Sequence, residues 1–442
     1  MRSIDMLKSA SDRHPIAQKI GRVEQLGGNS VTVFGLSDVA SIGHRVDFPS
    51  VPMVGGEVVG VEKSRVQVLV DGPTAGLRLN QPVVHLGETV VRPDAAWLGR
   101  VIDANGKPLD ERPLVQGVNP YALMSAPPMA ARRRSLGDRI PTGYALFNTI
   151  LPIVRGQRVG LFSGSGVGKS TLLAKFAQDM KADVIVIGLV GERGREVNHF
   201  VKSVLGPKGL ERSVVVAATS DQSAPVRRRA AFTAMAVAEY FRDQGLHVLL
   251  MLDSITRLAE AHREIAISSG ETAAMRGFPA SMVTMLAAFA ERAGPGGFDQ
   301  GDITALFTVL VSGSDMDEPV ADTLRGLLDG HVVLTREIAE RGRFPAVDIL
   351  QSVSRCLPEA ASKDENHLIS SLRSQLSIYE ESEIMVRSGL YQAGSNPALD
   401  IAISNFPAID AFASAYSDEI HTAFQRLSEC IPPTETNEMR CP

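Results

Sequence analysis

The chain of 442 residues is long enough for three domains of about 150 residues each, or for one small domain and one large one. Its 44% apolar and 21% charged residues, with 39 glycines and 25 prolines, are typical of a globular protein with many turns and exclude a fibrous or wholly disordered chain. With 45 basic and 50 acidic residues the net charge is −5, which excludes a whole-chain basic field of the kind that drives non-specific nucleic-acid binding.

The cysteines and the first residues of the chain indicate in which cellular compartment the protein works. Cys356, Cys430 and Cys441 come late, are odd in number and lack metal-ligand spacing, which indicates a reducing environment. The first residues lack the apolar segment of a signal peptide, and no run of about 18 apolar residues follows. We therefore expect a cytoplasmic protein that can still dock on a membrane assembly.

The first part of the chain predicts a small barrel. Residues 1–20 permit an amphipathic helix broken near Pro15, which is either a frayed terminus or a docking helix for a partner. Residues 21–91 then show the periodicity of strands, and several short strands with close turns suggest a small β-barrel domain. The expected strands are 31–34, 57–61, 66–70 and 83–91.

Residues 92–358 predict a large α/β domain. Its first part, 92–136, is rich in proline and turn residues and has the composition of a linker mixed with turns. Beyond it, continuous apolar runs alternate with amphipathic segments, such as 171–180 and 225–243. Such runs are typical of parallel strands that are covered on both faces, so we expect a doubly wound α/β core. The candidate strands are 159–162, 184–190, 214–218, 248–252 and 304–311.

Residues 359–442 are expected to form a small C-terminal helical domain with a tail. Strand signals stop after Pro358, and residues 359–389 and 407–429 have the pattern of helices separated by a break at 394–397. The tail after Ile431 has the composition of a disordered segment.

A glycine-rich loop between an apolar strand and a helix is the strongest motif. The run SGSGVGKST at 163–171 follows a strand and opens a helix, which is the context that a phosphate loop requires. Backbone N–H groups would surround the phosphates, Lys169 would reach the β- and γ-phosphates, and the Ser170 hydroxyl would ligate Mg²⁺. The strict motif begins with glycine, where this chain has Ser163. The expected nucleotide-binding residues are Gly164, Ser165, Gly166, Val167, Gly168, Lys169, Ser170 and Thr171.

Acidic residues follow two other apolar strands. Asp253 ends one of them and is the expected carboxylate for the magnesium shell beside a phosphate loop. Glu192 and Glu196 follow the strand 184–190, at the strand ends where α/β sites lie, and are candidates for orienting or deprotonating an attacking water. On spacing alone, a solvated ion-pair cluster that includes Arg193 explains them as well.

An arginine is the remaining group that phosphoryl transfer needs. It meets the charge that develops on the γ-phosphate, and it often comes from a neighbouring subunit. Arg355 is one candidate, although spacing alone does not distinguish it among 45 basic residues.

Several motifs, in order along the chain, resemble a known family. Those around the nucleotide site are similar to the catalytic subunits of rotary ATPases. The others narrow the resemblance to the flagellum-specific ATPases of bacterial type III export, which are close relatives of the ATPases of virulence injectisomes. The resemblance runs from about residue 21 to residue 428 and implies a P-loop RecA-like nucleotide-binding core, an N-terminal β-barrel and a C-terminal helical domain. The motifs lie at 97–103, 106–110, 163–171, 191–197, 253–257, 312–322, 344–348 and 352–355.

The resemblance implies an Mg-dependent ATPase in which water attacks the γ-phosphate of ATP, and it assigns the binding roles position by position. Lys169 and Ser170 would bind phosphate and Mg²⁺. Glu196 and Asp253 would hold magnesium through bound waters. Phe344 would take the place of the aromatic residue that stacks on adenine, with a core aromatic as the alternative.

The same resemblance assigns the catalytic roles. Glu192 would polarise the attacking water, with Arg193 beside it on the phosphates, and Arg355 would reach the ATP of the neighbouring subunit. In F-type and V-type rings the catalytic and regulatory subunits are separate chains. Because this chain carries both Glu192 and Arg355, we expect a ring of one kind of subunit, and Gly194, where F-type catalytic subunits usually have Thr, also favours the export ATPases.

The implied partners follow from the family. They are five further copies of the chain in a homohexamer, a stator-like regulatory protein on the N-terminal helix, a central stalk protein in the pore, export-gate membrane proteins and chaperone–substrate complexes. The protein would be cytoplasmic and peripherally associated with the inner-membrane export apparatus.

The implied function is ATP hydrolysis that energises export of flagellar proteins, by releasing them from chaperones and delivering them to the export gate. The alternative function is that of the ATPase of a virulence injectisome, because nothing in the catalytic core distinguishes flagellar from injectisome ATPases. An RNA-translocating hexameric helicase would need stacking aromatics in the barrel, where residues 21–91 contain only Phe34 and Phe48, so no nucleic acid is expected. A non-catalytic ring subunit is contradicted by Glu192.

Overall fold

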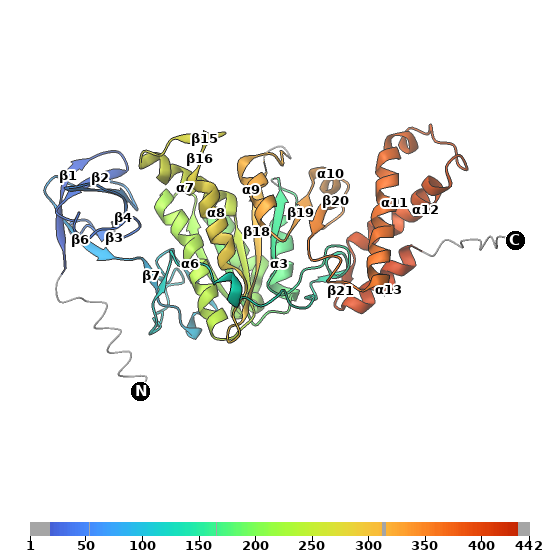
Figure 1. The fold of residues 1–442 in the computed structure, drawn as a ribbon, viewed down its shortest axis with the longest axis horizontal. Helices are drawn as coiled ribbons and strands as arrows, with labels where there is room; N and C mark the ends of the chain where they lie inside the picture. The colour runs from blue at the N-terminus through green and yellow to red at the C-terminus, as the bar shows by residue number, and fades with distance from the viewer. Residues whose placement is uncertain (1–17, 53, 165, 312–314, 432–442) are drawn as a thin grey trace.

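The computed structural model describes residues 18–431 except 53, 165 and 312–314. Along its longest axis lie, in order, a small barrel, a large sheet with helices on both sides and a group of C-terminal helices (Figure 1). Residues 1–17 of the expected docking helix, Ser165 of the loop and the tail from 432 onward lie outside the described residues. Within the described ranges, no helix is long and apolar enough to cross a membrane.

The N-terminal part is a closed barrel of six antiparallel strands in the order β1-β2-β5-β4-β3-β6. Alternate residues such as Val31 and Val33 are buried inside it, because successive side chains of a strand point to opposite faces. The predicted barrel is confirmed, but Ile20 of the expected helix begins β1. The expected strand 83–91 is instead two strands, β6 and β7 (Val90–Val91), because the chain turns at Gly87, whose φ is 82°. The strands are β1 (Ile20–Leu26), β2 (Ser30–Phe34), β3 (Arg45–Asp47), β4 (Gly55–Val61), β5 (Arg65–Val70) and β6 (Pro82–Gly87).

The central part is a nine-stranded sheet in the order β20-β19-β11-β18-β14-β12-β13-β8, with β17 paired to β18. All neighbours from β19 to β8 are parallel, and β20 is antiparallel at one edge. The predicted doubly wound core is confirmed, and β8, β17, β19 and β20 are additions to the expected strands. The strands are β8 (Arg100–Ile102), β11 (Arg158–Ser163), β12 (Val184–Glu192), β13 (Ser213–Thr219), β14 (Val248–Asp253), β17 (Gly294–Pro295), β18 (Asp302–Leu310), β19 (Gly330–Leu334) and β20 (Val347–Ser354).

Helices cover both faces of this sheet. In β12, Val184 and Val186 belong to the apolar core on one face, and Ile185 and Ile187 to the core on the other. Helices α6 to α9 pack on the first face, and α3 packs on the second (Figure 1). The longer helices are α3 (Lys169–Asp179), α6 (Ala224–Asp243), α7 (Ile255–Ser268), α8 (Ser281–Arg292) and α9 (Pro319–Leu327), and the shorter ones are α2 (Ala145–Asn148), α4 (Gly194–His199), α5 (Gly206–Glu211) and α10 (Arg336–Glu340).

The segment 92–136, expected to be a linker, is partly built into the core. Its strand β8 pairs with β13 at the edge of the sheet. Trp97 is fully buried, and the guanidinium of Arg100 makes two hydrogen bonds of 2.7 and 2.8 Å to Asp110. Only three residues of β8 are in the sheet, too few for a strand pattern to be visible in the sequence.

The C-terminal part has three helices instead of two. α11 (Lys363–Arg387) begins with a capping box of Ser362 and Glu365. The expected helix at 407–429 is wrong: α12 (Pro397–Ala413) runs through Pro407, and α13 (Ile420–Cys430) follows β21 (Tyr416–Ser417), which pairs with β10 (Gly143–Tyr144). Asn396 caps α12, and proline at the first helical position suits a helix start.

Candidate active site

The phosphate loop joins β11 to α3. Gly166 and Gly168 have φ of 81° and 87°, in the left-handed region that favours glycine, and Gly168 is the N-cap of α3. Val167 between them is 2% exposed and packs into the core, which anchors the loop. The N–H groups at the start of a helix have no intrahelical partners and attract anions, so this loop is suited to phosphate.

Lys169 and Asp253 form a salt bridge at the carboxyl ends of the strands. Nζ of Lys169 lies 2.6 Å from Oδ1 of Asp253, and the hydroxyl of Thr308 donates a hydrogen bond of 2.8 Å to the same oxygen. Asp253 is 4% exposed, so these contacts stabilise a carboxylate whose burial alone would be unfavourable. The sequence analysis missed Thr308. Its hydroxyl group stands within the apolar run of β18, and this could have indicated a polar role.

Glu192 ends β12, the strand beside β14. Burial raises the pKa of Glu192 to about 7; the charge of Asp253 and a hydrogen bond with Glu196 add to the rise, while Lys169 opposes it. A carboxyl group whose pKa is near neutrality can accept a proton at working pH, as a general base requires.

Arg193 and Glu196 lie beside Glu192 at the start of α4. Their side chains are 68% and 45% exposed, and Nη1 of Arg193 lies 3.5 Å from Oε1 of Glu196. An exposed pair at this distance contributes little to stability. Both residues line the cleft that is described below, so they can form this ion pair and still contact a bound ligand.

Lys169, Glu192, Arg193 and Glu196 line one cleft of about 1130 Å³, and Asp253 is joined to it through its salt bridge with Lys169. Basic and acidic side chains of α7, missed as site residues in the sequence analysis, form part of its wall, and Arg257 and Glu260 are joined by an ion pair of 2.7 Å. The sequence could have indicated Arg257 and Glu260, because they come just after Asp253 and therefore lie on a helix that starts beside it. The lining includes Ser163, Gly164, Gly166, Val167, Gly168, Lys169, Ser170, Thr171, Glu192, Arg193, Glu196, Arg227, Arg257, Glu260, Arg263, Arg276, Asp315, Glu318, Pro319 and Arg336.

Phe344 lies against the phosphate loop. A Cβ atom on Gly168 would be 3.2 Å from Cδ1 of Phe344, and the ring is 52% exposed. A half-exposed aromatic ring beside the loop has a free face for a base. The geometry disfavours the core aromatic that was the alternative.

Arg355 lies at the other end of the sheet from the cleft. It follows β20, which runs antiparallel to β19, and its neighbour Ser354 pairs with Gly330 at the start of β19. The phosphate loop follows the opposite end of β11, beside Leu334 at the end of β19. The exposed guanidinium of Arg355 therefore cannot serve the cleft of its own chain.

Comparison with known proteins identifies the family. The model of the ATP synthase alpha/beta family, nucleotide-binding domain, matches residues 143–354, and that of the type III secretion (EscN) ATPase C-terminal domain matches residues 361–426. The flagellum-specific ATP synthase of Caulobacter vibrioides is 44% identical, with 90% of this chain and 92% of that protein covered. The chain belongs to the type III export ATPases.

Other members of the type III export ATPases are similar over most of the chain. The type 3 secretion system ATPase of Xanthomonas euvesicatoria is 39% identical, with 94% of each chain covered. The assembled ATPase EscN of enteropathogenic E. coli superposes with a TM-score of 0.86 at 36% identity, over 93% of this chain and 99% of that one. EscN in complex with its central stalk EscO matches with a TM-score of 0.84. The P-loop fold with a barrel and C-terminal helices is thus common to this chain and a type III export ATPase.

Proposed function

We propose that the chain is the ATPase that energises export of flagellar proteins through a type III export apparatus. The observation that carries the proposal is that Lys169, which is paired with Asp253, and Glu192 line one cleft, in a chain that is 44% identical to a flagellum-specific relative. The free energy of hydrolysis would serve to release exported subunits from chaperones and to deliver them to the export gate.

The loop would bind the nucleotide through its backbone. The N–H groups of Gly166 to Thr171, at the start of α3, would face the phosphates, and Lys169 would exchange its salt bridge with Asp253 for contacts to the β- and γ-phosphates. The ring of Phe344 stacks on adenine at the mouth of the cleft.

The donor set fits Mg²⁺ that arrives with the nucleotide. Among the described residues, no group of three or more His, Cys, Asp or Glu side chains could hold a metal ion by itself. Magnesium in nucleotide sites is held by substrate phosphates with few protein groups and several waters. Ser170 is exposed and lines the cleft, where its hydroxyl would be a direct ligand, and Glu196 lines the same cleft for a bound water. Asp253 would reach a bound water once Lys169 leaves its salt bridge for the phosphates. Magnesium would supply charge neutralisation on the phosphates.

Glu192 orients the water for in-line attack on the γ-phosphate and accepts its proton, for which a pKa of about 7 is suitable. Lys169 and Arg193 neutralise charge from within the same chain. Arg355 does so from the next subunit, because its place at the other end of the sheet leaves it available only to a second copy.

The site is therefore completed between subunits, and we propose a homohexamer. The assembled EscN and its complex with a central stalk support a ring with a stalk protein in its pore. A stator-like protein on residues 1–20, export-gate proteins and chaperone–substrate complexes are further proposed partners at the cytoplasmic face of the inner membrane. We propose functional units at 21–91, 92–358 and 359–442.

The test is the ATPase rate against protein concentration for the wild type, Glu192→Gln and Arg355→Ala, followed by mixing of the two variants. We expect specific activity to rise with concentration, to be lost in each variant and to return in part on mixing. Turnover that is independent of concentration and survives Arg355→Ala would contradict the shared site.

Flagellar export is tested separately from hydrolysis. Deletion of the gene from the native host is expected to abolish swimming and secretion of filament subunits, and the wild-type gene but not Glu192→Gln should restore both. Normal swimming with loss of effector secretion would favour the injectisome alternative. No observation favours RNA translocation, since Phe48 is buried in the barrel and only Phe34 is exposed there.

A further inference from the structure

Two contacts hold Arg355 against one segment of its own chain. The backbone N–H of Arg355 donates a hydrogen bond of 3.0 Å to the carbonyl of Asp329, and its Nη2 donates one of 2.8 Å to the carbonyl of Arg325. Arg325 lies on α9, and Asp329 directly precedes β19. The main chain and the guanidinium of Arg355 are thus fixed by the short connection between α9 and β19.

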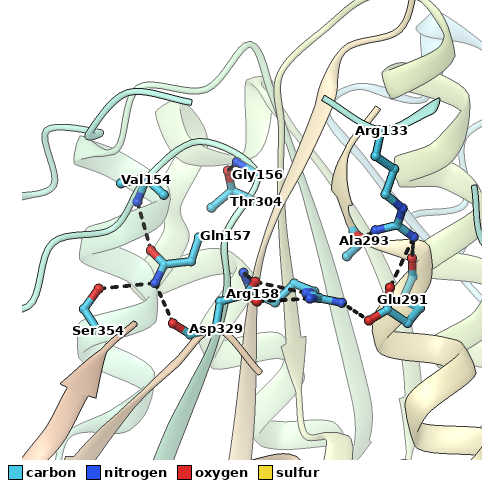
Figure 2. A network of polar contacts seen from close by, with 10 residues as sticks. All are labelled: Arg133, Val154, Gly156, Gln157, Arg158, Glu291, Ala293, Thr304, Asp329 and Ser354. Carbon is cyan, nitrogen blue, oxygen red and sulfur yellow. Dashed lines mark hydrogen bonds and ion pairs between the residues drawn. The ribbon is translucent and has the colours of Figure 1, made fainter. Parts of the chain in front are cut away.

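The carboxylate of Asp329 is fixed in turn by Arg158, the first residue of β11. The backbone N–H and Nε of Arg158 donate to Oδ2 and Nη2 donates to Oδ1, all at 3.0 Å, so that both carboxylate oxygens are held (Figure 2). The same guanidinium pairs with Glu291 on α8. A paired, two-pronged arginine contact restricts rotation of both side chains.

Gln157 connects this pair to the end of β20. Its side chain is fully buried, and Nε2 donates to the carbonyl of Asp329 at 3.1 Å and to the hydroxyl of Ser354 at 3.3 Å (Figure 2). Its Oε1 accepts a hydrogen bond of 2.9 Å from the N–H of Val154. The side-chain amide of Gln157 therefore holds both Ser354, which precedes Arg355, and Asp329, whose carbonyl accepts a hydrogen bond from the N–H of Arg355.

An exposed arginine at the edge of a sheet has many rotamers, and each would place its charge differently. Displacement of a catalytic group by about 1 Å can lower a rate by about 10²-fold. We propose that Gln157 and Asp329 are positioning residues that hold Arg355 in the orientation required by the active site of the neighbouring subunit. This inference rests on the proposed function, in which Arg355 acts on that subunit's ATP.

The elements that hold Arg355 also reach the cleft of their own chain. β11 begins at Arg158 and leads into the phosphate loop, and α9 begins at Pro319, which lines the cleft. The network therefore joins the part of the chain that binds nucleotide to the part that it offers to its neighbour.

The test uses the full-length variants Gln157→Leu and Asp329→Asn. We expect kcat to fall by about 10- to 100-fold in each, while binding of a fluorescent ADP analogue to the variant's own cleft stays at the wild-type value. The matched control is Asp110→Asn, which weakens a similar two-pronged Arg–Asp contact at the opposite edge of the sheet and should leave kcat unchanged. If Gln157→Leu does not fold, Asp329→Asn remains informative because its side-chain oxygen still accepts from Arg158.

Mixing separates positioning from a general structural defect. Each variant should regain activity when mixed with Glu192→Gln, which has an intact Arg355, and should not regain it with Arg355→Ala. Recovery with Arg355→Ala, recovery with neither partner, or a wild-type kcat would overturn the proposal. The pair Glu192→Gln and Arg355→Ala tests the proposed function by itself: if that pair does not complement, the shared site is wrong; if it does, only the positioning role is at stake.

Discussion

Arg355 and Lys169 lie at opposite ends of the same β-sheet. Lys169 follows the carboxyl end of β11, and Arg355 is level with the first residues of that strand, because Ser354 pairs with Gly330 at the start of β19. The five steps from Arg158 to Ser163 alone correspond to about 16 Å. Each chain therefore presents its cleft at one end of its sheet and an exposed arginine at the other.

Arg355→Lys is expected to be nearly as harmful as removal of the side chain. Lysine keeps the charge but lacks the planar fork that contacts two phosphate oxygens, so kcat should fall by on the order of 10²–10³-fold with unchanged ADP binding. Steady-state kinetics and ADP titration check this. Arg325→Lys is the control, because Arg325 contributes only its carbonyl to the contact with Arg355. A kcat near the wild-type value in Arg355→Lys would contradict the role.

Glu192→Gln is expected to stabilise the protein above neutral pH. The pKa of Glu192 is about 7 in the folded protein against an ordinary 4.5, so its contribution to stability is complete below pH 4.5 and is lost as pH rises through 7. Glutamine carries no charge to bury. At pH 8 the free energy of unfolding should exceed that of the wild type by about 1–2 kcal/mol, a value reduced because the side chain is partly solvated.

Urea denaturation at pH 5 and pH 8 measures this difference. The exposed Glu211→Gln is the control and should show no gain at pH 8. A Glu192→Gln gain of the same size at both pH values would mean that burial of the charge is not its cause. The acidic limb of the ATPase pH profile should likewise lie near pH 7, with activity rising above it.

Phe344→Ala is expected to weaken ATP binding, while Phe344→Tyr keeps it. Stacking of a base on an aromatic ring contributes about 1–3 kcal/mol, which corresponds to an increase in Kd of about 5- to 150-fold. The kcat at saturating ATP should change little. Phe298→Ala removes an aromatic ring that is 88% exposed and lies before the start of β18, at the end of the sheet opposite the phosphate loop, and it should leave Kd unchanged. Equal effects of the two alanine variants would rule out stacking.

Arg229→Met is expected to be strongly destabilising. The side chain of Arg229 is 2% exposed and joins α6 to Glu57 and Asp71 of the barrel at 3.3 and 3.0 Å. Burial would raise the pKa of Asp71, but Arg229 and Arg45 lower it to about 2, so the pair is charged above pH 4. Loss of one partner leaves buried charge and should cost about 3–5 kcal/mol of unfolding free energy.

Thermal and urea denaturation check this loss. Arg65→Met breaks a solvent-exposed pair with Glu24 on the same barrel and should cost much less than Arg229→Met. Equal losses in Arg229→Met and Arg65→Met would mean that the buried network does not hold the barrel to the core.

The sequence predicted those strands and site residues that can be recognised from their immediate neighbours in the chain. β12 and β14 are continuous apolar runs that end at Glu192 and Asp253, and the phosphate loop directly follows β11, so motif and strand end coincide. β20 was missed because it is an edge strand with a mixed burial pattern. Thr308 was missed because only strand order brings it to Asp253.

The C-terminal error has a local cause as well. Pro407 suggested a helix start, but α12 continues through it because Leu399, Ile409 and Phe412 are buried on one side. Tertiary packing thus outweighs the hydrogen bond that proline removes. Arg355 and Phe344 were assigned from the resemblance alone, because nothing nearby in the sequence indicates the cleft.

A chain with a cleft at one end of its sheet and an arginine at the other has a direction, and copies joined through these ends meet head to tail. Each head-to-tail contact uses one cleft and one arginine, and a head-to-tail array leaves no unused end only when it closes on itself. An open array of any length keeps one cleft without an arginine and one arginine without a cleft. Addition of the last subunit to a ring therefore completes two active sites at once.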